Sequence, residues 1–252
     1  MSAEPNTCDK FLGGRIALWQ PKNGYRAGID PVLLAAATPA SPGQSVLELG
    51  CGAGAASLCL AARVTGISLT GVEIQPEYAA LARRNAVENS ISFDVHEADL
   101  RDLPGPLRQL SFDHVIMNPP YYERCRSTGS QNPGRDIALG GETPVVDWIH
   151  IGAKRLKPKG VLTLIQRIDR LPDVLAALPK SLGSIRVVPI AARNGRAAHL
   201  FVLQARKNGR AAFRLSAPFV LHLGAEHLRD GNDYTPVTEA ILRDGSALVI
   251  PD

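Results

Sequence analysis

Residues 45–54 read SVLELGCGAG and join a short apolar run to a cluster of glycines. The apolar run predicts a buried strand, and the alanine- and leucine-rich stretch 55–63 has the spacing of a helix. A glycine-rich turn between a strand and a helix lets the backbone approach a ligand and directs free helix N–H groups toward it. We therefore expect a ligand-binding turn, whose glycines are Gly50, Gly52 and Gly54.

The rest of the chain repeats this alternation of strands and helices. The pattern predicts further strands at 67–73, 91–95, 112–117, 161–166, 185–190 and 199–205. It predicts a helix over 76–89 and another that begins at Thr143-Pro144 and ends near 157–160. Such alternation is typical of an α/β fold of the Rossmann-like kind, with a mostly parallel sheet covered on both faces. There is no internal repeat and no low-complexity linker, so we expect residues 1–252 to form a single domain.

Composition excludes several classes of protein. The 252 residues are 45% hydrophobic and 21% charged, which is typical of a globular chain with a buried core. The four cysteines form no CxxC pair and have no histidines at ligand spacing, so we expect no metal site. The amino terminus lacks the features of a signal peptide, and no run approaches the ~18 apolar residues of a membrane span. We expect a cytoplasmic protein with reduced thiols and no membrane contact.

The net charge of +4 is unevenly distributed along the chain. Residues 1–150 hold 12 basic and 16 acidic side chains, whereas residues 151–252 hold 16 basic and 8 acidic ones. Within 151–210 the counts are 13 basic and 2 acidic. This polarity makes an anionic partner of the carboxyl-terminal part worth testing.

Acidic residues follow the glycine turn at positions that suit an adenosine ligand. The turn is GxGxG rather than the GxGxxG that favours a nucleotide pyrophosphate, and Glu73 closes the second strand about 20 residues on, where a carboxylate can accept from both ribose hydroxyls. Asp99, after the third strand, can accept from an adenine amino group. Glu48, just before the turn, is a further candidate. Together these residues favour S-adenosylmethionine over NAD.

The fourth strand runs directly into Asn118-Pro119-Pro120-Tyr121, at the edge where open α/β sheets bind their ligands. Two prolines restrict the backbone, so the Asn118 amide oxygen and the Pro119 carbonyl can face one point. Two acceptors there would orient a planar amine such as that of adenine, by positioning and electrostatics. Tyr121 offers a flat face for stacking on a flipped base. The alternative is an ordinary proline turn with a buried tyrosine.

The sequence resembles the class I S-adenosylmethionine-dependent methyltransferases that carry NPPY. Residues 20–34, QPKNGYRAGIDPVLL, are similar to the amino-terminal block of the valine-tRNA adenine-N6 methyltransferases, which modify the adenosine beside the anticodon. The resemblance implies a seven-stranded sheet whose last strand is antiparallel. It also implies that residues 1–44 form a segment over the cofactor pocket, ahead of a catalytic core at 45–210 and an extension at 211–252. In that segment Tyr25, Arg26 and Asp30 would fold over the cofactor, with Asp30 near its methionine end.

Basic residues beyond the motif are candidates for holding a nucleic acid. A stretch of about 20 residues, 122–142, has no clear period and contains Arg124, Arg126 and Arg135. It is either a clamp on the phosphates flanking the target base or a mobile surface loop. Lys157, Arg193 and Arg196 belong to the basic set of the carboxyl-terminal part. Such residues either contact RNA or cap a helix and face solvent.

We therefore predict N6-methylation of an adenine in RNA, most simply in a valine tRNA anticodon loop, with S-adenosylmethionine as the cofactor. Asn118 and the two prolines would orient the amine, and Tyr121 would stack on the base. A protein glutamine methyltransferase is the first alternative, because a side-chain amide nitrogen poses the same chemical problem. A cofactor- and RNA-binding module without catalysis is the second. No feature of the sequence predicts the oligomeric state.

Overall fold

A computed structural model describes residues 6–120, 143–224 and 233–250. Its main sheet contains seven long strands in the order β8-β9-β7-β6-β3-β4-β5. In chain order they are β3 (Ser45–Leu49), β4 (Ser68–Glu73), β5 (Phe93–Glu97), β6 (Phe112–Met117), β7 (Leu156–Arg167), β8 (Leu182–Ala191) and β9 (Ala198–Lys207). Pairing is parallel except at β9, which lies antiparallel between β7 and β8. The expected seven-stranded sheet with an antiparallel last strand is thus confirmed.

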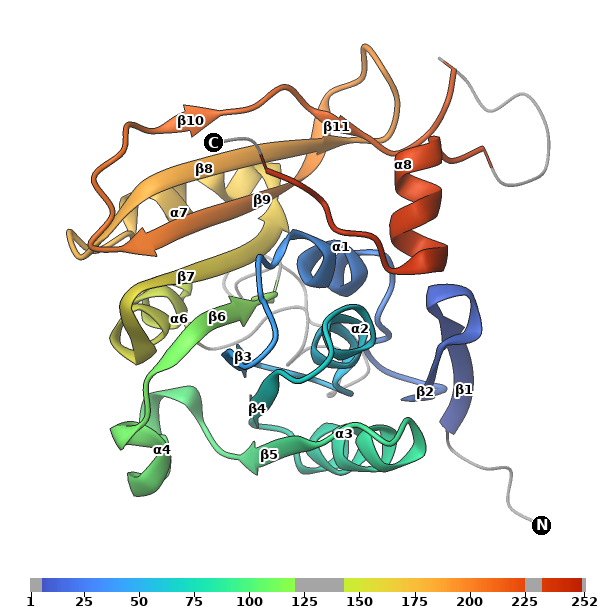
Figure 1. The fold of residues 1–252 in the computed structure, drawn as a ribbon, viewed down its shortest axis with the longest axis vertical. Coiled ribbons are helices and arrows are strands. Elements are labelled where there is room, and N and C mark those ends of the chain that lie inside the picture. Colours follow the sequence, from blue (N-terminus) through green and yellow to red (C-terminus); the bar gives the residue numbers. More distant parts are fainter. Residues whose placement is uncertain (1–5, 121–142, 225–232, 251–252) are drawn as a thin grey trace.

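Helices cover both faces of this sheet (Figure 1). One face packs on α1 (Asp30–Ala37), α2 (Ala55–Arg63) and α3 (Pro76–Glu88), and the other on α4 (Gly105–Gln109), α6 (Val145–Arg155) and α7 (Leu171–Ala176). Successive residues of a strand alternate between the faces, so Val46 and Ile116 join the first core cluster while Leu47 and Val115 join the second. Strand residues that are apolar on both sides are what a sheet covered on both faces requires.

Chain ends add structure that the sequence analysis does not predict. At the amino terminus, β1 (Asn6–Phe11) and β2 (Ile16–Pro21) form an antiparallel hairpin, which contacts α2 and α3 through β2. At the carboxyl-terminal side, the two-residue strands β10 (Arg214–Leu215) and β11 (Phe219–Val220) lie parallel to β8. A short helix α8 (Pro236–Glu239) continues into a π-helical turn, Ala240–Asp244, whose Ile241 is fully buried in the first core cluster.

Several predicted boundaries differ from the observed ones, and two of the differences have a clear physical reason. The helix expected from Thr143-Pro144 to 157–160 begins at Val145 and ends at Arg155, and β7 starts at the next residue. Leu156 pairs with Phe112 before the register shifts, so residues 157–160 form an irregularity inside the strand rather than a helix end. The strand expected at 91–95 begins at Phe93, because the Ile91 N–H donates to the Ala86 carbonyl and completes the end of α3.

Helices long and apolar enough to cross a membrane are absent from the described residues. Those residues also contain no group of three or more histidine, cysteine or acidic side chains arranged to hold a metal ion.

Candidate functional site

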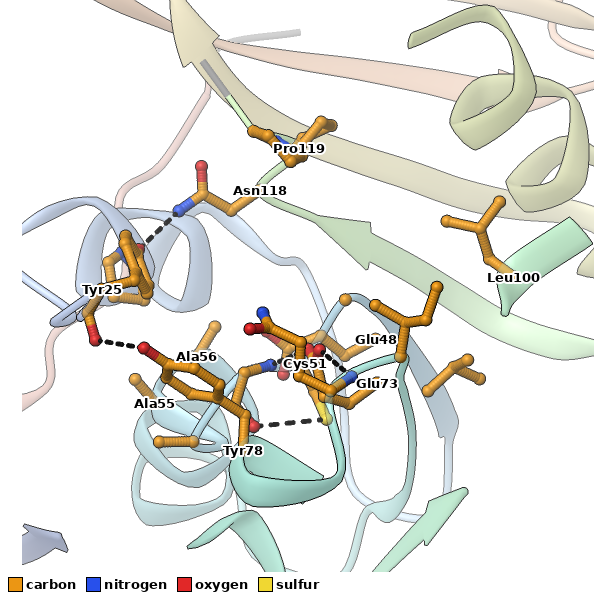
Figure 2. A pocket seen from close by; sticks show the side chains of 18 of the residues that line it. Tyr25, Glu48, Cys51, Ala55, Ala56, Glu73, Tyr78, Leu100, Asn118 and Pro119 are labelled. Atoms are coloured by element: carbon orange, nitrogen blue, oxygen red, sulfur yellow. Dashed lines mark hydrogen bonds between the residues drawn. The ribbon is translucent and has the colours of Figure 1, made fainter. Parts of the chain in front are cut away.

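A cavity of about 270 Å³ opens at the carboxyl ends of β3, β4 and β6 (Figure 2). Its walls come from the glycine turn, the residues after β4 and β5, residues 118–120 after β6, and the segment between β2 and α1. The charged side chains among its described lining residues are Glu48, Glu73, Asp99 and Arg101. With three carboxyl groups and one guanidinium, the cavity suits a cationic ligand better than a pyrophosphate.

Gly50 and Gly52 serve this cavity in different ways. Both have left-handed backbones, with φ of 65° and 53°. A Cβ on Gly50 would lie 2.4 Å from the indole of Trp148 in α6, so this glycine allows α6 to pack against the turn. A Cβ on Gly52 would meet no atom within 4 Å, although the residue lines the cavity. At Gly52 the turn therefore leaves room for a ligand against its backbone.

Glu73 is held by the backbone around it. Its Oε2 accepts from the Gly52 N–H at 2.8 Å and its Oε1 accepts from the Gln75 N–H at 2.9 Å. Burial raises the pKa of this carboxyl group, and the backbone donors oppose that shift. Each carboxylate oxygen can accept more than one hydrogen bond, so Glu73 retains capacity for ribose hydroxyls.

Glu48, on β3, is a buried acid beneath the same turn. Its Oε2 accepts from the Ser57 N–H at 3.0 Å and from the Ser57 hydroxyl at 2.5 Å. Burial nevertheless raises its pKa to about 8, so the protonated form predominates at neutral pH.

Asp99 lies across the cavity, just after β5. The side chain of Arg101 donates to its carboxylate, with Nη2 2.7 Å from Oδ2, and this contact lowers the pKa of Asp99. Asp99 is therefore an ionised acceptor at the cavity wall. Arg101 lines the cavity beside it, a neighbour that the sequence analysis does not include.

The Asn118 side chain has one satisfied end and one unsatisfied end. Its Nδ2 donates to the Tyr25 hydroxyl at 3.5 Å, and Figure 2 shows the amide oxygen turned away from that contact. This Oδ1 atom is buried and has no hydrogen-bond partner among the described residues. An unsatisfied buried acceptor costs about 1–3 kcal/mol, so its retention here calls for a donor that arrives with a ligand.

Gln166, near the end of β7, contacts the two prolines that follow Asn118. Its Nε2 donates to the Pro119 carbonyl at 3.0 Å and approaches the Pro120 carbonyl at 3.4 Å. Sequence reasoning missed this residue. The available signal was a glutamine at the end of an otherwise apolar strand, and its side chain is only 1% exposed.

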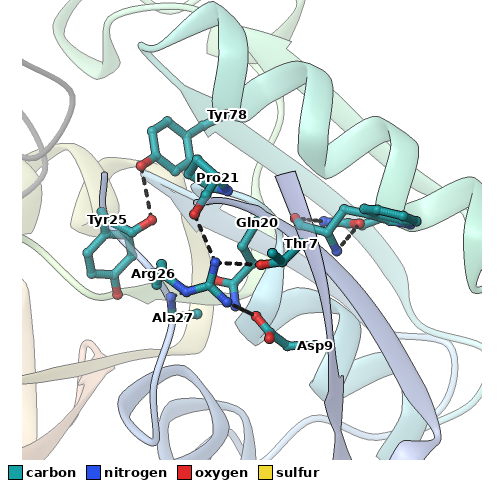
Figure 3. Close-up of polar contacts among 10 residues, drawn as sticks. Thr7, Asp9, Gln20, Pro21, Tyr25, Arg26, Ala27 and Tyr78 are labelled. Carbon is teal, nitrogen blue, oxygen red and sulfur yellow. Dashed lines mark hydrogen bonds and ion pairs between the residues drawn. The ribbon is translucent and has the colours of Figure 1, made fainter. Parts of the chain in front are cut away.

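The segment before α1 is tied to the amino-terminal hairpin (Figure 3). The Arg26 guanidinium pairs with Asp9 and donates to the Thr7 hydroxyl and the Pro21 carbonyl, and Gln20 links Asp9 to the Ala27 N–H. Arg26 is not among the described residues that line the cavity; its contacts fasten the hairpin to this segment.

Tyr25, the neighbour of Arg26, does line the cavity, and its carbonyl accepts from the Tyr78 hydroxyl at 3.0 Å. Asp30 is not a lining residue. It opens α1, and its charge raises the pKa of Tyr25, second to burial. Burial in turn raises the pKa of Asp30 to about 6.

The basic residues of 151–210 divide between opposite edges of the sheet. Lys157 lies at the start of β7, where it pairs with Asp113 at 2.8 Å and contacts Ser45 at 3.3 Å, both at the starts of their strands. This is the edge opposite the cavity, so Lys157 lies away from the candidate site and pairs within the fold. Neighbours on that edge are used to hold the fold, since Arg155 and Lys207 each donate to a backbone carbonyl.

Arg193 and Arg196 lie in the turn between β8 and β9, at the same edge as the cavity. Arg193 pairs with Asp233, while Arg196 is exposed. Arg167 and Arg170, which follow Gln166 directly, share this edge and were missed by the sequence analysis. Four further predicted residues lie outside the described residues: Tyr121, Arg124, Arg126 and Arg135.

The residues present fit S-adenosylmethionine. Gly52 leaves space against the turn, acidic groups face the cavity, and two buried polar atoms of its lining, Asn118 Oδ1 and Trp148 Nε1, have no partner among the described residues. These are features of a site shaped for a polar, positively charged ligand. The strand order and this cavity at the carboxyl edge define a class I S-adenosylmethionine-dependent methyltransferase.

Comparison with known proteins narrows the class. A family model described as a methyltransferase domain matches residues 46–126. The tRNA1(Val) (adenine(37)-N6)-methyltransferase of Porphyromonas gingivalis (strain ATCC 33277) is 33% identical over 178 residues, which are 66% of this chain and 68% of that protein. The corresponding protein of Photorhabdus laumondii is 36% identical over 125 residues, 47% of this chain and 51% of that protein. The chain belongs to this family of adenine-N6 methyltransferases.

A solved structure has the same fold along almost its whole length. It is described as a predicted O-methyltransferase from Agrobacterium tumefaciens, with a TM-score of 0.71, 28% identity, and coverage of 87% of this chain and 98% of that one. The alternation of strands and helices and the antiparallel last strand are therefore those of known methyltransferases.

Proposed function

We propose that this chain transfers the methyl group of S-adenosylmethionine to N6 of an adenine in RNA, and that its substrate is the adenosine beside the anticodon of a valine tRNA. The observation that carries the chemistry is the buried, unpartnered Oδ1 of Asn118 beside the Pro119 carbonyl at the cavity edge. Relatives named for this reaction support the substrate. The chain spans 68%, 51% and 61% of the first three of them.

Two acceptors in this arrangement would activate an exocyclic amine. The nitrogen lone pair of adenine is delocalised into the ring, so the amine is a poor nucleophile. Hydrogen bonds from its two N–H groups to Asn118 Oδ1 and the Pro119 carbonyl would favour a pyramidal nitrogen and direct its lone pair toward the cofactor. When bound, S-adenosylmethionine supplies an electrophilic methyl group on a sulfonium. The alkylated nitrogen then loses its proton readily, so no general base is required.

The cavity residues divide the cofactor among them in this proposal. Glu73 would accept from the ribose hydroxyls and Asp99 from the adenine amine. Gly52 would lie against the ligand through its backbone, as Gly50 and Gly54 shape the turn. Near the methionine end, protonated Glu48 and Tyr25 would form the polar wall of the site. The charge of Asp30, which acts on Tyr25, would favour the positive charge of the cofactor.

RNA would approach the edge of the sheet that bears the cavity. Arg193 and Arg196 lie on that edge with Arg167 and Arg170, so phosphates bound there would flank a base presented to Asn118. The proposed stacking of the base on Tyr121, and phosphate contacts from the arginines of 122–142, concern residues outside the described ones. They stay predictions, as does a cytoplasmic location.

The test is Asn118→Ala, assayed with labelled cofactor and transcripts of the valine tRNA. Because one of two amine acceptors is lost, we expect transfer to fall by roughly 100-fold or more, in line with the loss of one hydrogen bond aimed at a reacting group. Cofactor affinity, measured by calorimetry, should change far less. Asn89→Ala, which removes a half-buried amide that bonds Ala17 in the hairpin, controls for loss of stability. Wild-type transfer by Asn118→Ala would refute the mechanism.

A second experiment tests the substrate. Nucleoside mass spectrometry of tRNA from a strain lacking this protein should show loss of N6-methyladenosine from one valine isoacceptor. An unchanged nucleoside profile, with labelled methyl groups appearing on protein, would support the glutamine methyltransferase instead.

A further inference from the structure

The backbone that carries the two acceptors, at residues 118–119, has few hydrogen-bonding groups to hold it in place. Pro119 and Pro120 have no backbone N–H, so this segment can be anchored through hydrogen bonds only by its carbonyl groups. A carbonyl group must therefore find a donor elsewhere in the fold. Asn118 itself is held by Tyr25 through its side chain and not through the proline backbone.

Gln166 supplies that donor from the neighbouring strand. β6 and β7 pair in parallel as far as Met117 and Leu164, so Gln166 lies two residues beyond the last pair, level with Pro119. Its Nε2 is 3.0 Å from the Pro119 carbonyl oxygen and 3.4 Å from that of Pro120. Thus one amide spans both carbonyls of the proline pair.

The orientation of the Gln166 amide is itself determined. Its Oε1 accepts from the Arg167 N–H at 2.8 Å, which leaves the NH2 group facing the prolines. The side chain is buried, and its strand pairs on the other side with β9, where Gln166 is opposite Phe201. A buried amide with both ends bonded has little freedom, which makes it a suitable support for another group.

We propose that Gln166 is a positioning residue that aims the Pro119 carbonyl at the substrate amine. This role rests on the proposed function. The carbonyl oxygen has two lone pairs, of which Gln166 engages one and the substrate amine would engage the other. Gln166 is not among the described residues that line the cavity, so it would act through the proline backbone. Displacement of an orienting group by about 1 Å can reduce a rate by about 100-fold, so loss of this anchor should affect the chemical step.

The first variant is Gln166→Leu, which preserves approximate volume and removes the donor. We expect kcat for methyl transfer to RNA to fall by roughly 10- to 100-fold, while KM for the cofactor is unchanged. The matched control is Gln204→Leu. Gln204 is also a buried glutamine that donates to a backbone carbonyl, but its acceptor, Ala37 at 2.6 Å, ends α1 and does not line the cavity as Pro119 does. Both variants should lose similar stability in urea unfolding, and Gln204→Leu should retain kcat.

The second variant, Gln166→Glu, distinguishes a donor from mere packing. A protonated carboxyl group can donate to the Pro119 carbonyl and still accept from the Arg167 N–H, whereas a carboxylate can only accept. We therefore expect the ratio of the variant rate to the wild-type rate to increase as pH falls. A residue that only fills space would give a ratio independent of pH.

The outcomes separate the two proposals. If wild-type protein transfers methyl groups to the RNA and Gln166→Leu matches it in kcat, or if the rate ratio of Gln166→Glu does not depend on pH, the positioning role is overturned and the proposed function stands. If wild-type protein transfers no methyl group to RNA, the proposed function fails and this role in it fails as well.

Discussion

Substitution by alanine should have different effects at Gly50 and Gly52, although these glycines are two residues apart. At Gly50 it should chiefly lower stability, and at Gly52 it should chiefly weaken cofactor binding. In Gly50→Ala the new methyl group would lie 2.4 and 2.7 Å from two ring carbons of Trp148, in a buried contact between the turn and α6. A left-handed backbone costs a residue with a Cβ about 1–2 kcal/mol. Overpacking adds about 1–3 kcal/mol. Gly50→Ala should therefore lower the free energy of unfolding by about 2–5 kcal/mol.

Gly52→Ala should lower stability only through the left-handed backbone, because no overpacking is expected there. Its Cβ meets no atom within 4 Å, so we expect a loss of about 1–2 kcal/mol in stability. The methyl group instead occupies space at the cavity wall that the cofactor would use. Overpacking of the bound state by about 1–3 kcal/mol corresponds to a roughly 5- to 150-fold increase in Kd.

Urea unfolding and calorimetric titration with S-adenosylmethionine separate these effects. Both measurements are made on both variants, and the comparison is internal because the substitution and the backbone region are the same. If Gly50→Ala were no less stable than Gly52→Ala, the packing of Trp148 against the turn would not be as described. If Gly52→Ala bound the cofactor as tightly as the wild type, the ligand would not lie against this part of the turn.

Four further predictions follow, two on pH, one on RNA binding and one on the hairpin. Burial lowers the pKa of His114 to about 4, so as pH falls the unfolded chain binds the imidazole proton before the folded protein does. The free energy of unfolding should therefore fall between pH 6.5 and 4. His114→Gln should remove this dependence in urea unfolding. The raised pKa of Glu48 has the opposite effect on stability. The stability that it contributes is fully present below pH 4.5 and is lost as pH rises through about 8. Glu48→Gln should therefore reduce the loss of stability between these pH values. Filter binding at several salt concentrations gives the slope of log tRNA affinity against log salt concentration. Arg196→Gln should reduce this slope by about 1, whereas Lys159→Gln, on the opposite edge of the sheet, should leave it unchanged. Equal effects would contradict the placement of the RNA on the edge that bears the cavity. Arg26→Leu should cost at most about 1 kcal/mol of stability because its ion pair is partly exposed, and a complete loss of cofactor binding would show that Arg26 contacts the ligand after all.

Sequence reasoning succeeded where glycine or proline marks the end of an element. The strands at 45–49 and 112–117 and the helix at 55–63 were predicted with their observed limits, because glycines follow the first strand and Pro119-Pro120 follows the second. It failed at 157–160, where Lys157-Pro158-Lys159-Gly160 looks like a helix end. Those residues form an irregularity in a strand that has already begun. Pairing with a distant strand decides that outcome, and no local pattern records it.

The candidate site shows the same division. Residues whose position follows from the end of a strand, such as Glu73, Asp99 and Asn118, were found and line one cavity. Gln166 was missed because its contacts depend on register with another strand. The position of Lys157 at the opposite edge could not be predicted, because charge counted along the chain does not say which end of a strand carries it. The ion pair of Arg26 could not be predicted, because its partner, Asp9, lies in a hairpin that the sequence pattern did not indicate.

The insertion of β9 between β7 and β8 has a consequence for the order of folding. Strands β3 to β7 pair with one another and need no later part of the chain for their hydrogen bonds. Among the described residues, β8 pairs only with β9 and the short strands β10 and β11, all of which follow it in the sequence. During synthesis, β8 therefore leaves the ribosome without a neighbour, and β7 keeps an open edge until residues 198–207 have emerged. Most of the cofactor cavity can thus be assembled before β8 has joined the sheet.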